Sequence, residues 1–515
     1  MFQQEVTNYS SQQNQKDLLS QPASAARAIA ELSVEFSPLM AKNKISATFT
    51  KPLKGAPWIV DATQNPSQAY KVRGALASIL RAVADDYTSV WTASAGNHGA
   101  GVAYASKLLG VEAVVYVPFT APKVKVRLIE SFGARVEQRG RDFTECLRIA
   151  REERAVPYSS SAFIHPFDDL VVAAGQGTLG VELVDHVKRN LAFMANDLAN
   201  IFLPIGGGGL IAGVTSVLRN HWPREAPSPR IIGVVDEGVP ASVMGTLFGR
   251  PIETLADTVA DGTRVMKVGE TFLAVAPLID NIMVVPHDTI VTTMRYYKER
   301  MGLVLEASGA LAITGERLAR KYGLFPESSV TEASYALVTG RNVDGDTFDD
   351  LTVHAQRRCL RGHSRLAVDV EIPERDGELL RFLSVVESYN IVSLTYRQLD
   401  NSEVGRLRVE FELPAQRKST LMSSIGEAFP GSQQLPPGHQ TLLPVSTPSI
   451  RSFRERLITP EDSPGAFKRC IAELNSSGEL GSVGFLYYRQ PSGIGSRPQV
   501  LIGTDTTKHT LPRLK

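Results

Sequence analysis

Short apolar runs alternate with amphipathic stretches through the middle of the chain. Between residues 24 and 357, β-rich runs such as SVWTA, EAVVYVP and NIFLPI are each followed by a stretch in which apolar residues recur at helical spacing. Such alternation with short connections is typical of βαβ units in a mostly parallel sheet with helices on both faces. The pattern predicts an α/β fold for residues 24–357, with ligands bound beyond the carboxyl ends of the strands.

The pattern changes on either side of this region. Residues 1–23 are polar and lack an apolar period, which predicts a disordered arm. Residues 363–435 follow the order strand, helix, strand, strand, and residues 450–515 repeat it faintly. The Pro- and Gln-rich stretch PGSQQLPPGHQ separates the two copies as a linker. This repeat predicts a tandem pair of small α+β domains.

Composition excludes several classes of partner. The 515 residues are 43% hydrophobic and 21% charged, and 55 Lys plus Arg balance 54 Asp plus Glu, so no nucleic-acid or membrane partner is predicted. Cys146, Cys359 and Cys470 are isolated, which argues against a disulfide framework or a metal site. The polar N-terminus does not resemble a signal peptide, and no apolar window is long enough to cross a membrane. These features predict a cytoplasmic protein.

Lys71 stands where a loop turns into a predicted helix. Behind it Leu76, Ile79, Leu80 and Val83 recur at helical spacing, which predicts one apolar face. An ammonium at a helix N-terminus faces the positive end of the dipole, which costs roughly 0.3–1 kcal/mol and lowers the pKa of the amine. The position suits an amine nucleophile, although a solvated surface lysine fits the same pattern.

Two glycine-rich loops follow predicted strands. In TASAGNHGAG, residues 92–101, the Ser94 hydroxyl and backbone N–H groups at a helix N-terminus form a candidate site for a carboxylate; a tight structural turn is the alternative. In PIGGGGLIAG, four successive glycines at 206–209 allow backbone amides to surround a phosphate. No Gly-Lys-Ser/Thr follows, so this is not a P-loop. Asp236 ends a later predicted strand, as the ribose-binding acid of a dinucleotide site would, but the glycine spacing does not fit the G-x-G-x-x-G motif. A plain structural turn is the remaining alternative to a phosphate site.

Two further residues stand out near predicted turns. Thr339 follows the β-rich run in ALVTGRNVD, where its hydroxyl fits a structural turn. Glu306 precedes the small residues of EASGALA, where it fits a capping carboxylate on a core helix. Neither residue by itself indicates a function.

Taken together, six stretches resemble the threonine dehydratase (threonine ammonia-lyase) family of fold-type II pyridoxal phosphate enzymes. They occur in the family's order and spacing between about residues 37 and 344: AYKVRGAL, SAGNHGAGVAYASKLLG, AGQGTLGVEL, PIGGGGLIAG, ADGTRVMKVGETF and EASGALA. The resemblance implies a tryptophan synthase β-like fold of two subdomains with parallel sheets. The C-terminal repeats look like the ACT-like regulatory pair of the biosynthetic enzymes.

The resemblance also implies a role for each matching residue. Lys71 would hold pyridoxal 5'-phosphate as a Schiff base, Asn97 would bond the ring hydroxyl, and Thr339 would be a neutral partner for the pyridine nitrogen. The substrate carboxylate would be bound by Ser94, Ala95, Gly96, Asn97 and His98. The phosphate would be cradled by Gly206, Gly207, Gly208, Gly209 and Leu210.

The implied reaction is deamination of L-threonine or L-serine to 2-oxobutanoate or pyruvate and ammonia. A branched-chain amino acid, isoleucine first, would inhibit a homotetramer or homodimer. The sequence departs from the family where Ala69 and Tyr70 replace the usual Ser-Phe before the lysine, and where Arg341 enters the usual SGANVNF segment. These departures leave open a specialised β-elimination, β-replacement or racemisation of another hydroxy amino acid. A non-catalytic amino-acid sensor is the alternative of another class.

Overall fold

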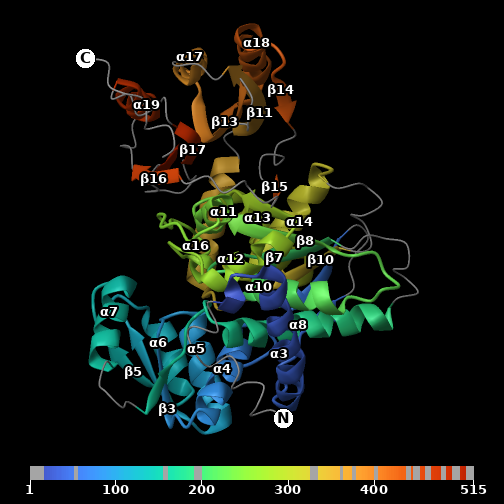
Figure 1. Ribbon diagram of the computed structural model, residues 1–515, viewed down its shortest axis with the longest axis vertical. Helices are drawn as coiled ribbons and strands as arrows, with labels where there is room; N and C mark the ends of the chain where they lie inside the picture. The colour runs from blue at the N-terminus through green and yellow to red at the C-terminus, as the bar shows by residue number, and fades with distance from the viewer. Residues whose placement is uncertain are drawn as a thin grey trace.

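The computed structural model describes most of the chain. The described residues are 17–50, 56–154, 160–190, 200–324, 334–359, 363–373, 378–398, 404–435, 442–444, 453–458, 466–476, 483–489 and 499–505. They form three sheets, and Figure 1 shows the C-terminal sheet at the top, a large sheet in the middle and a small sheet at the lower left. Most of the predicted N-terminal arm, residues 1–16, lies outside the described residues.

The large sheet has seven strands in the order β1-β2-β10-β7-β8-β9-β15. Their bounds are β1 Thr48–Thr50, β2 Trp58–Asp61, β7 Asn200–Pro204, β8 Arg230–Asp236, β9 Asn281–Val285, β10 Ser334–Val338 and β15 Leu442–Pro444. The five strands from β2 to β9 are parallel, whereas β1 and β15 pair antiparallel at the two edges. The predicted parallel α/β sheet is confirmed, and the edge strand β15 comes from beyond the predicted catalytic domain.

The small sheet is parallel throughout, in the order β5-β4-β3-β6. Its strands are β3 Ser89–Ala93, β4 Glu112–Val117, β5 Arg135–Gln138 and β6 Ser161–Phe163. All four lie between β2 and β7 in the chain, so the small sheet is an insertion into the large one. This arrangement gives the two subdomains with parallel sheets that the resemblance implies.

Helices cover these two sheets. They are α3 Pro22–Lys42, α4 Val72–Ala84, α5 Asn97–Leu109, α6 Lys123–Ser131, α7 Phe143–Arg154, α8 Leu170–Arg189, α10 Gly209–His221, α11 Ala241–Phe248, α12 Glu270–Val275, α13 His287–Met301, α14 Ala307–Lys321 and α16 Gly345–Cys359, with short 3₁₀ helices η1 Asp261–Thr263 and η2 Ala276–Leu278. Helices α3, α8 and α10 contact one another below the large sheet, and α14 packs on its strands β7, β8 and β10 (Figure 1). Within the described part of the chain, no helix is both long and apolar enough to span a membrane.

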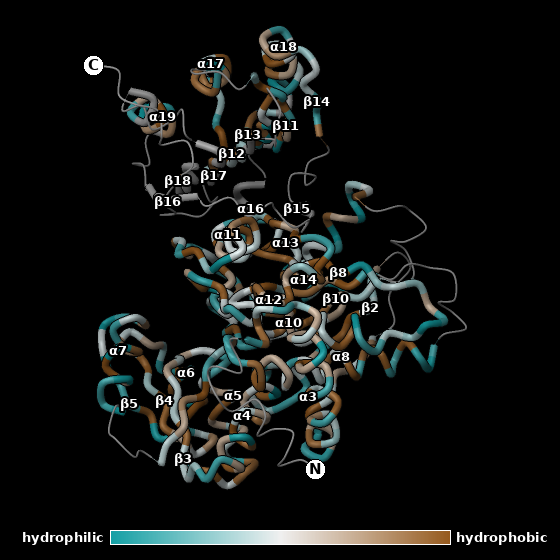
Figure 2. The backbone as a smooth tube through the Cα atoms, in the orientation of Figure 1, coloured by the Kyte–Doolittle hydropathy of each residue, from teal (hydrophilic) through white to brown (hydrophobic). Residues whose placement is uncertain are grey.

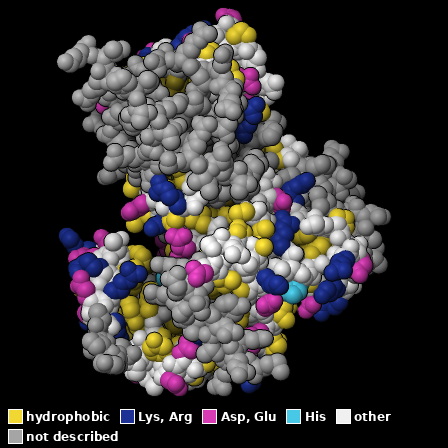
Figure 3. Space-filling model, in the orientation of Figure 1, with side chains coloured by type: hydrophobic (Ala, Val, Ile, Leu, Met, Phe, Trp, Pro, Cys, Tyr) yellow, Lys and Arg dark blue, Asp and Glu magenta, His cyan; other side chains and the backbone are white. Residues whose placement is uncertain are grey.

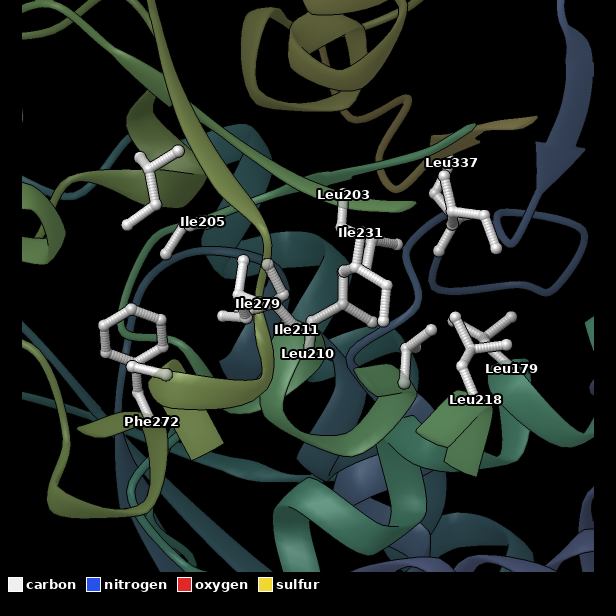
Figure 4. Packing of buried hydrophobic residues seen from close by; sticks show 14 of the residues in the cluster. Leu179, Leu203, Ile205, Leu210, Ile211, Leu218, Ile231, Phe272, Ile279 and Leu337 are labelled. Carbon is white, nitrogen blue, oxygen red and sulfur yellow. The ribbon is translucent and has the colours of Figure 1, made fainter. Parts of the chain in front are cut away.

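Buried aliphatic side chains join the large sheet to its helices. Figure 4 shows Leu203, Ile231 and Leu337 from the strands beside Leu179 of α8 and Leu210 of α10. In Figure 2 the hydrophobic colour follows such inner faces, while hydrophilic residues follow the outer turns. Burial of these side chains, worth about 1.5–3 kcal/mol each, holds α10 and the loop before it against the sheet.

A buried charge fixes helix α4 to helix α8. Arg73, fully buried, donates to Glu182 Oε1 (2.7 Å), Glu182 Oε2 (3.1 Å) and Thr178 Oγ1 (2.8 Å). Glu182 Oε2 also accepts the backbone N–H of Ala47 (2.7 Å). Removing one partner of such a pair typically costs 3–5 kcal/mol because the other charge stays buried. The pair therefore holds the first turn of α4, which follows Lys71, in a fixed position.

The C-terminal strands form one antiparallel sheet in the order β14-β11-β13-β12-β17-β18-β16. The elements are β11 His363–Pro373, α17 Glu378–Val385, β12 Asn390–Gln398, β13 Val404–Pro414, η3 Ala415–Arg417, α18 Lys418–Ala428, β14 Gln433–Leu435, β16 Phe453–Ile458, α19 Ala466–Ser476, β17 Val483–Arg489 and β18 Gln499–Asp505. Both copies begin with strand, helix, strand, strand, as predicted. Pairing of β12 with β17 joins them into a single sheet, while residues 436–440 of the predicted linker lie outside the described residues.

Candidate active site

Lys71 is the N-cap residue of α4, at the predicted junction of loop and helix. Its Nζ donates to the carbonyl oxygen of Pro166 (2.7 Å), and burial lowers the pKa of the amine to about 8. At pH 7 such an amine is about a tenth neutral, whereas an ordinary lysine is almost wholly charged. Leu76 and Ile79 are buried as predicted, but Val83 is 43% exposed, so the predicted apolar face does not extend to the end of the helix.

The loop at residues 94–96 leads from β3 into α5. The Ser94 hydroxyl oxygen accepts the N–H of Gly96 (3.2 Å), which leaves the hydroxyl proton available to another acceptor. The buried His98 donates from Nε2 to the carbonyl of Ile164 (3.1 Å), and burial lowers the pKa of its imidazole to about 3. His98 is therefore neutral, and its side chain is used within the fold, so only its backbone can serve the predicted carboxylate site.

The glycine loop at residues 206–209 lies between β7 and α10, and every position is closely surrounded. A Cβ added at Gly207 would lie 2.2 Å from the Phe167 ring, and one at Gly208, where φ is +97°, would lie 2.2 Å from Phe272. Leu210 turns its side chain into the core, so it offers only its backbone N–H to a ligand. The loop thus combines a helix N-terminus with no room for side chains, which suits a phosphate bound by backbone amides.

The segment around Pro166 connects the lysine with the glycine loop. His165 Nδ1 accepts the N–H groups of Phe167 (3.2 Å) and Asp168 (2.8 Å), and Asp168 Oδ1 accepts the N–H of Thr271 (3.0 Å). Burial lowers the pKa of His165 to about 4, so the imidazole stays neutral and can accept. This segment, IHPFDD, was missed in the sequence, where only its position between a predicted strand and a helix could have marked it.

The segment after β10 closes the opposite side of the site. The carbonyl of Thr339 accepts the N–H of Tyr70 (3.2 Å), and the buried Thr339 hydroxyl lies 3.4 Å from the carbonyl oxygen of Ser308, to which it donates weakly. Arg341 forms an ion pair with Asp61 at the carboxyl end of β2. The guanidinium is therefore held by a carboxylate, and this pair occupies the region where the sequence departs from the family.

Asn97 and Glu306 meet although 209 residues separate them in the chain. Asn97 Nδ2 donates to Glu306 Oε1 (2.7 Å), which also accepts the Ser308 hydroxyl (2.7 Å). Burial raises the pKa of Glu306. Glu306 is the N-cap residue of α14 but makes no side-chain cap bond, so its interpretation as a capping carboxylate is wrong. Asn342, which the sequence did not single out, donates to Asn97 Oδ1 (2.7 Å).

The site lies where the two parallel sheets meet. Lys125 of α6 bridges to Asp261 of η1 (2.9 Å), which joins the small-sheet side to the large-sheet side. A Cβ at Gly206 would lie 3.0 Å from Thr263 of the same 3₁₀ helix. Figure 3 shows the surface hollowed between the lobe at the lower left and the middle of the molecule. The predicted lysine, carboxylate loop, glycine loop and Thr339 thus surround one region.

Residues 35–333, more than half of the chain, match the family described as "Pyridoxal-phosphate dependent enzyme". The chain belongs to this family. The Geobacter sulfurreducens protein named L-threonine ammonia-lyase is 32% identical to this pyridoxal-phosphate dependent enzyme over 354 residues, 67% of this chain and 82% of that protein. The Burkholderia multivorans protein named L-threonine dehydratase biosynthetic IlvA is 35% identical over 347 residues, 65% and 63% of the two chains.

A solved structure agrees with this assignment. The processed form of threonine deaminase isoform 2 from Solanum lycopersicum superposes on this pyridoxal-phosphate dependent enzyme with a TM-score of 0.54, at 28% identity, and covers 63% of this chain and 93% of that chain. The resemblance expected from the six motifs is confirmed. The cofactor of the enzyme is accordingly pyridoxal phosphate.

The residues present fit this cofactor. Lys71 supplies an amine whose pKa is lowered to about 8, and the loop at residues 206–209 packs so closely against Phe167, Thr263 and Phe272 that its positions must be glycine, which leaves only backbone groups to meet a phosphate. Asn97 has one Nδ2 hydrogen on Glu306 and a second one left for an acceptor oxygen. Thr339 offers a neutral hydroxyl beside them. These four features match an aldehyde, a phosphate, a ring oxygen and a ring nitrogen.

Proposed function

We propose that the enzyme deaminates L-threonine, and L-serine by the same route, to 2-oxobutanoate or pyruvate and ammonia. The observation that carries the proposal is the buried Lys71 amine, held on Pro166 next to the glycine loop, in a chain whose relatives are named threonine ammonia-lyase and threonine dehydratase. An amine of lowered pKa beside an anion cradle suits a reaction that begins by removing a proton next to an amino group.

Each residue of the proposed site has a task. Pyridoxal phosphate, when bound, supplies an electron sink for the electron pair released at the substrate α-carbon. Lys71 Nζ takes the α-proton, and the Ser94 hydroxyl with backbone N–H groups within residues 95–98 holds the substrate carboxylate at the N-terminus of α5. The β-hydroxyl leaves as water with proton assistance, and the released enamine tautomerises and loses ammonia to water. The neutral hydroxyl of Thr339, if turned from the Ser308 carbonyl, would donate to the ring nitrogen and leave it unprotonated, which would favour elimination over reactions that need a long-lived carbanion.

The proposal predicts the products of an amino-acid panel. We expect L-threonine to yield equal amounts of ammonia and 2-oxobutanoate, and L-serine to yield ammonia and pyruvate, with the purified protein carrying the visible absorption of its cofactor. Ammonia and 2-oxo acid are measured in parallel for each amino acid. Inversion of serine or threonine without ammonia release, or turnover of another hydroxy amino acid alone, would contradict the assignment.

We further propose that the C-terminal sheet is regulatory and binds a branched-chain amino acid, isoleucine first, in a homotetramer or homodimer. Two connections between the C-terminal third of the chain and the large-sheet side support this role. Arg365 of β11 donates to Glu237 after β8 (3.1 Å) and also lies 3.4 Å from Glu410, and all three side chains are largely buried. In addition, β15, which lies in the chain between β14 and β16 of the C-terminal sheet, is itself an edge strand of the large sheet and pairs with β9. An effector that favours one state by about 1–3 kcal/mol would change substrate affinity about 5- to 150-fold.

Removing the ion pair between Arg365 and Glu237 is predicted to weaken inhibition of the enzyme by isoleucine. We expect the double variant Arg365→Gln with Glu237→Gln to need at least about fivefold more isoleucine for half-inhibition of threonine turnover, since it removes the ion pair that joins the C-terminal sheet to the large-sheet side. The matched control is Arg408→Gln, because Arg408 pairs with Asp369 inside the C-terminal sheet (3.0 Å). Unchanged inhibition in the double variant would reject this route of coupling. We also propose that the enzyme works in the cytoplasm, because its three cysteines are isolated, as is usual in a reducing compartment.

A further inference from the structure

Asn342 forms hydrogen bonds whose direction is unambiguous. Its Nδ2 donates to the backbone carbonyl of Ser67 (2.8 Å) and to Asn97 Oδ1 (2.7 Å). A backbone carbonyl only accepts hydrogen bonds, so the Asn342 atom that faces Ser67 must be the amide nitrogen. Both hydrogens of that nitrogen are then used, one on each acceptor.

This anchor determines the orientation of Asn97. The atom of Asn97 that receives the second hydrogen must be its oxygen, and its nitrogen therefore lies on the other side, where it donates to Glu306 (2.7 Å). The second hydrogen of Asn97 Nδ2 remains for an acceptor in the site. Without such an anchor the two ends of an amide, which have nearly the same shape, could exchange places.

We propose that Asn342 is a positioning residue, which makes Asn97 present an N–H and not a C=O to the ring oxygen of pyridoxal phosphate. The inference rests on the proposed role of Asn97 toward the cofactor. An N–H stabilises the ionised ring oxygen, whereas an amide oxygen would repel it. Asn342 thus acts on the electronic state of the cofactor through Asn97, without touching the cofactor.

Backbone hydrogen bonds hold the segment that carries Asn342 in a fixed position. The N–H of Arg341 donates to the carbonyl of Gln68 (3.1 Å), and Ala69 pairs with Gly340, so the segment after β10 is fastened to the segment before Lys71. A Cβ at Gly340 would lie 1.9 Å from Glu306 Oε1, so only glycine lets this segment pass Glu306. One segment therefore carries both Thr339 and Asn342.

The decisive substitution is Asn342→Asp, which keeps the shape and removes the donor. The new carboxylate would face two acceptors, so Asn97 must turn its nitrogen toward Asn342 or lose the contact. We expect the dissociation constant for pyridoxal phosphate to rise about tenfold or more. We also expect the pH titration of the absorption bands of the bound cofactor to shift toward a higher apparent pKa of the ring oxygen. Asn220→Asp is the matched control, because Asn220 donates to the Ser216 carbonyl (2.8 Å) in the last turn of α10, at the end of that helix away from the glycine loop.

A second pair of variants separates positioning from general damage. In an Asn97→Ala background, Asn342→Asp should no longer change cofactor affinity or the titration, because its effect passes through Asn97. Asn342→Ser, which keeps a single donor, should fall between wild type and Asn342→Asp, and it replaces Asn342→Asp if that variant does not fold. Equal cofactor binding and an equal titration in wild type and the folded variants would overturn the inference. Failure of the wild-type protein to bind pyridoxal phosphate would instead overturn the proposed function.

Discussion

Replacing Lys71 with alanine is expected to lower ammonia release from threonine by at least about 10³-fold, because one amine both holds the cofactor and moves the α-proton. The measurement is steady-state turnover, together with mass analysis of peptides after borohydride reduction. Wild-type protein should carry the reduced cofactor on the peptide that contains Lys71, and the variant should not. Lys107→Ala is the matched control, since Lys107 is exposed in the last turn of α5.

The pH dependence of cofactor capture tests the same lysine from another direction. Burial lowers the pKa of Lys71 to about 8. The fraction of the amine that is neutral and nucleophilic therefore rises as the pH passes through 8, and it levels off at higher pH. The rate at which cofactor-free protein takes up pyridoxal phosphate should follow that curve. A rate that still increases tenfold per pH unit above 9 would indicate an ordinary lysine and contradict the assigned environment.

Gly207→Val is expected to weaken binding of pyridoxal phosphate by about 100-fold or more, through loss of several amide contacts to the phosphate. The structure adds a second cause, since the new side chain would meet the Phe167 ring at 2.2 Å. Phe167 follows Pro166, whose carbonyl oxygen accepts a hydrogen bond from Lys71 Nζ. Displacement of the Phe167 ring would therefore also disturb the position of Lys71. Equilibrium binding followed by absorbance measures the loss, and the thermal unfolding midpoint is recorded beside it.

Two variants identify the cause of that loss. Gly345→Val is the matched control, because a Cβ at Gly345 meets no atom within 4 Å. Adding Phe167→Ala to Gly207→Val removes the clash with the ring, and the double variant should stay poor in cofactor binding if the amides themselves are obstructed. Wild-type affinity in folded Gly207→Val would show that this loop does not hold the phosphate.

Local signals in the sequence were sufficient for much of the fold and for part of the site. The alternation of β-rich runs and amphipathic stretches predicted the parallel sheets, because the hydrophobic periods of strands (2 residues) and helices (3.6 residues) can be recognised within each segment alone. Lys71 and the loop at residues 206–209 were found because a charge at a helix start and four glycines are conspicuous on their own. The family motifs then placed Asn97 and Thr339 with them.

Residues whose role depends on a distant partner were missed. Asn342 acts through Asn97, 245 residues away, and nothing in its own neighbourhood distinguishes it from a turn asparagine. Glu306 was interpreted from its position before a helix, where a capping bond is the local expectation, yet Asn97 and Ser308 bind it instead. In the same way, the repeat predicted two small domains, but only the long-range pairing of β12 with β17 joins them in one sheet.

The insertion of the small sheet into the large one has a consequence for synthesis on the ribosome. Strand β2 pairs with β10, so Trp58 can pair with Tyr335 only after 277 more residues have been synthesised. All strands of the small sheet, by contrast, lie between Ser89 and Phe163. At about 5–20 residues per second, this delay is about 14–55 s. The small sheet can thus form on the nascent chain first, while the edge of β2 that later pairs with β10 is still unpaired. Lys71, which lies between β2 and the small sheet in the chain, reaches its final surroundings only after β10 has emerged, because Tyr70 bonds Thr339 behind that strand.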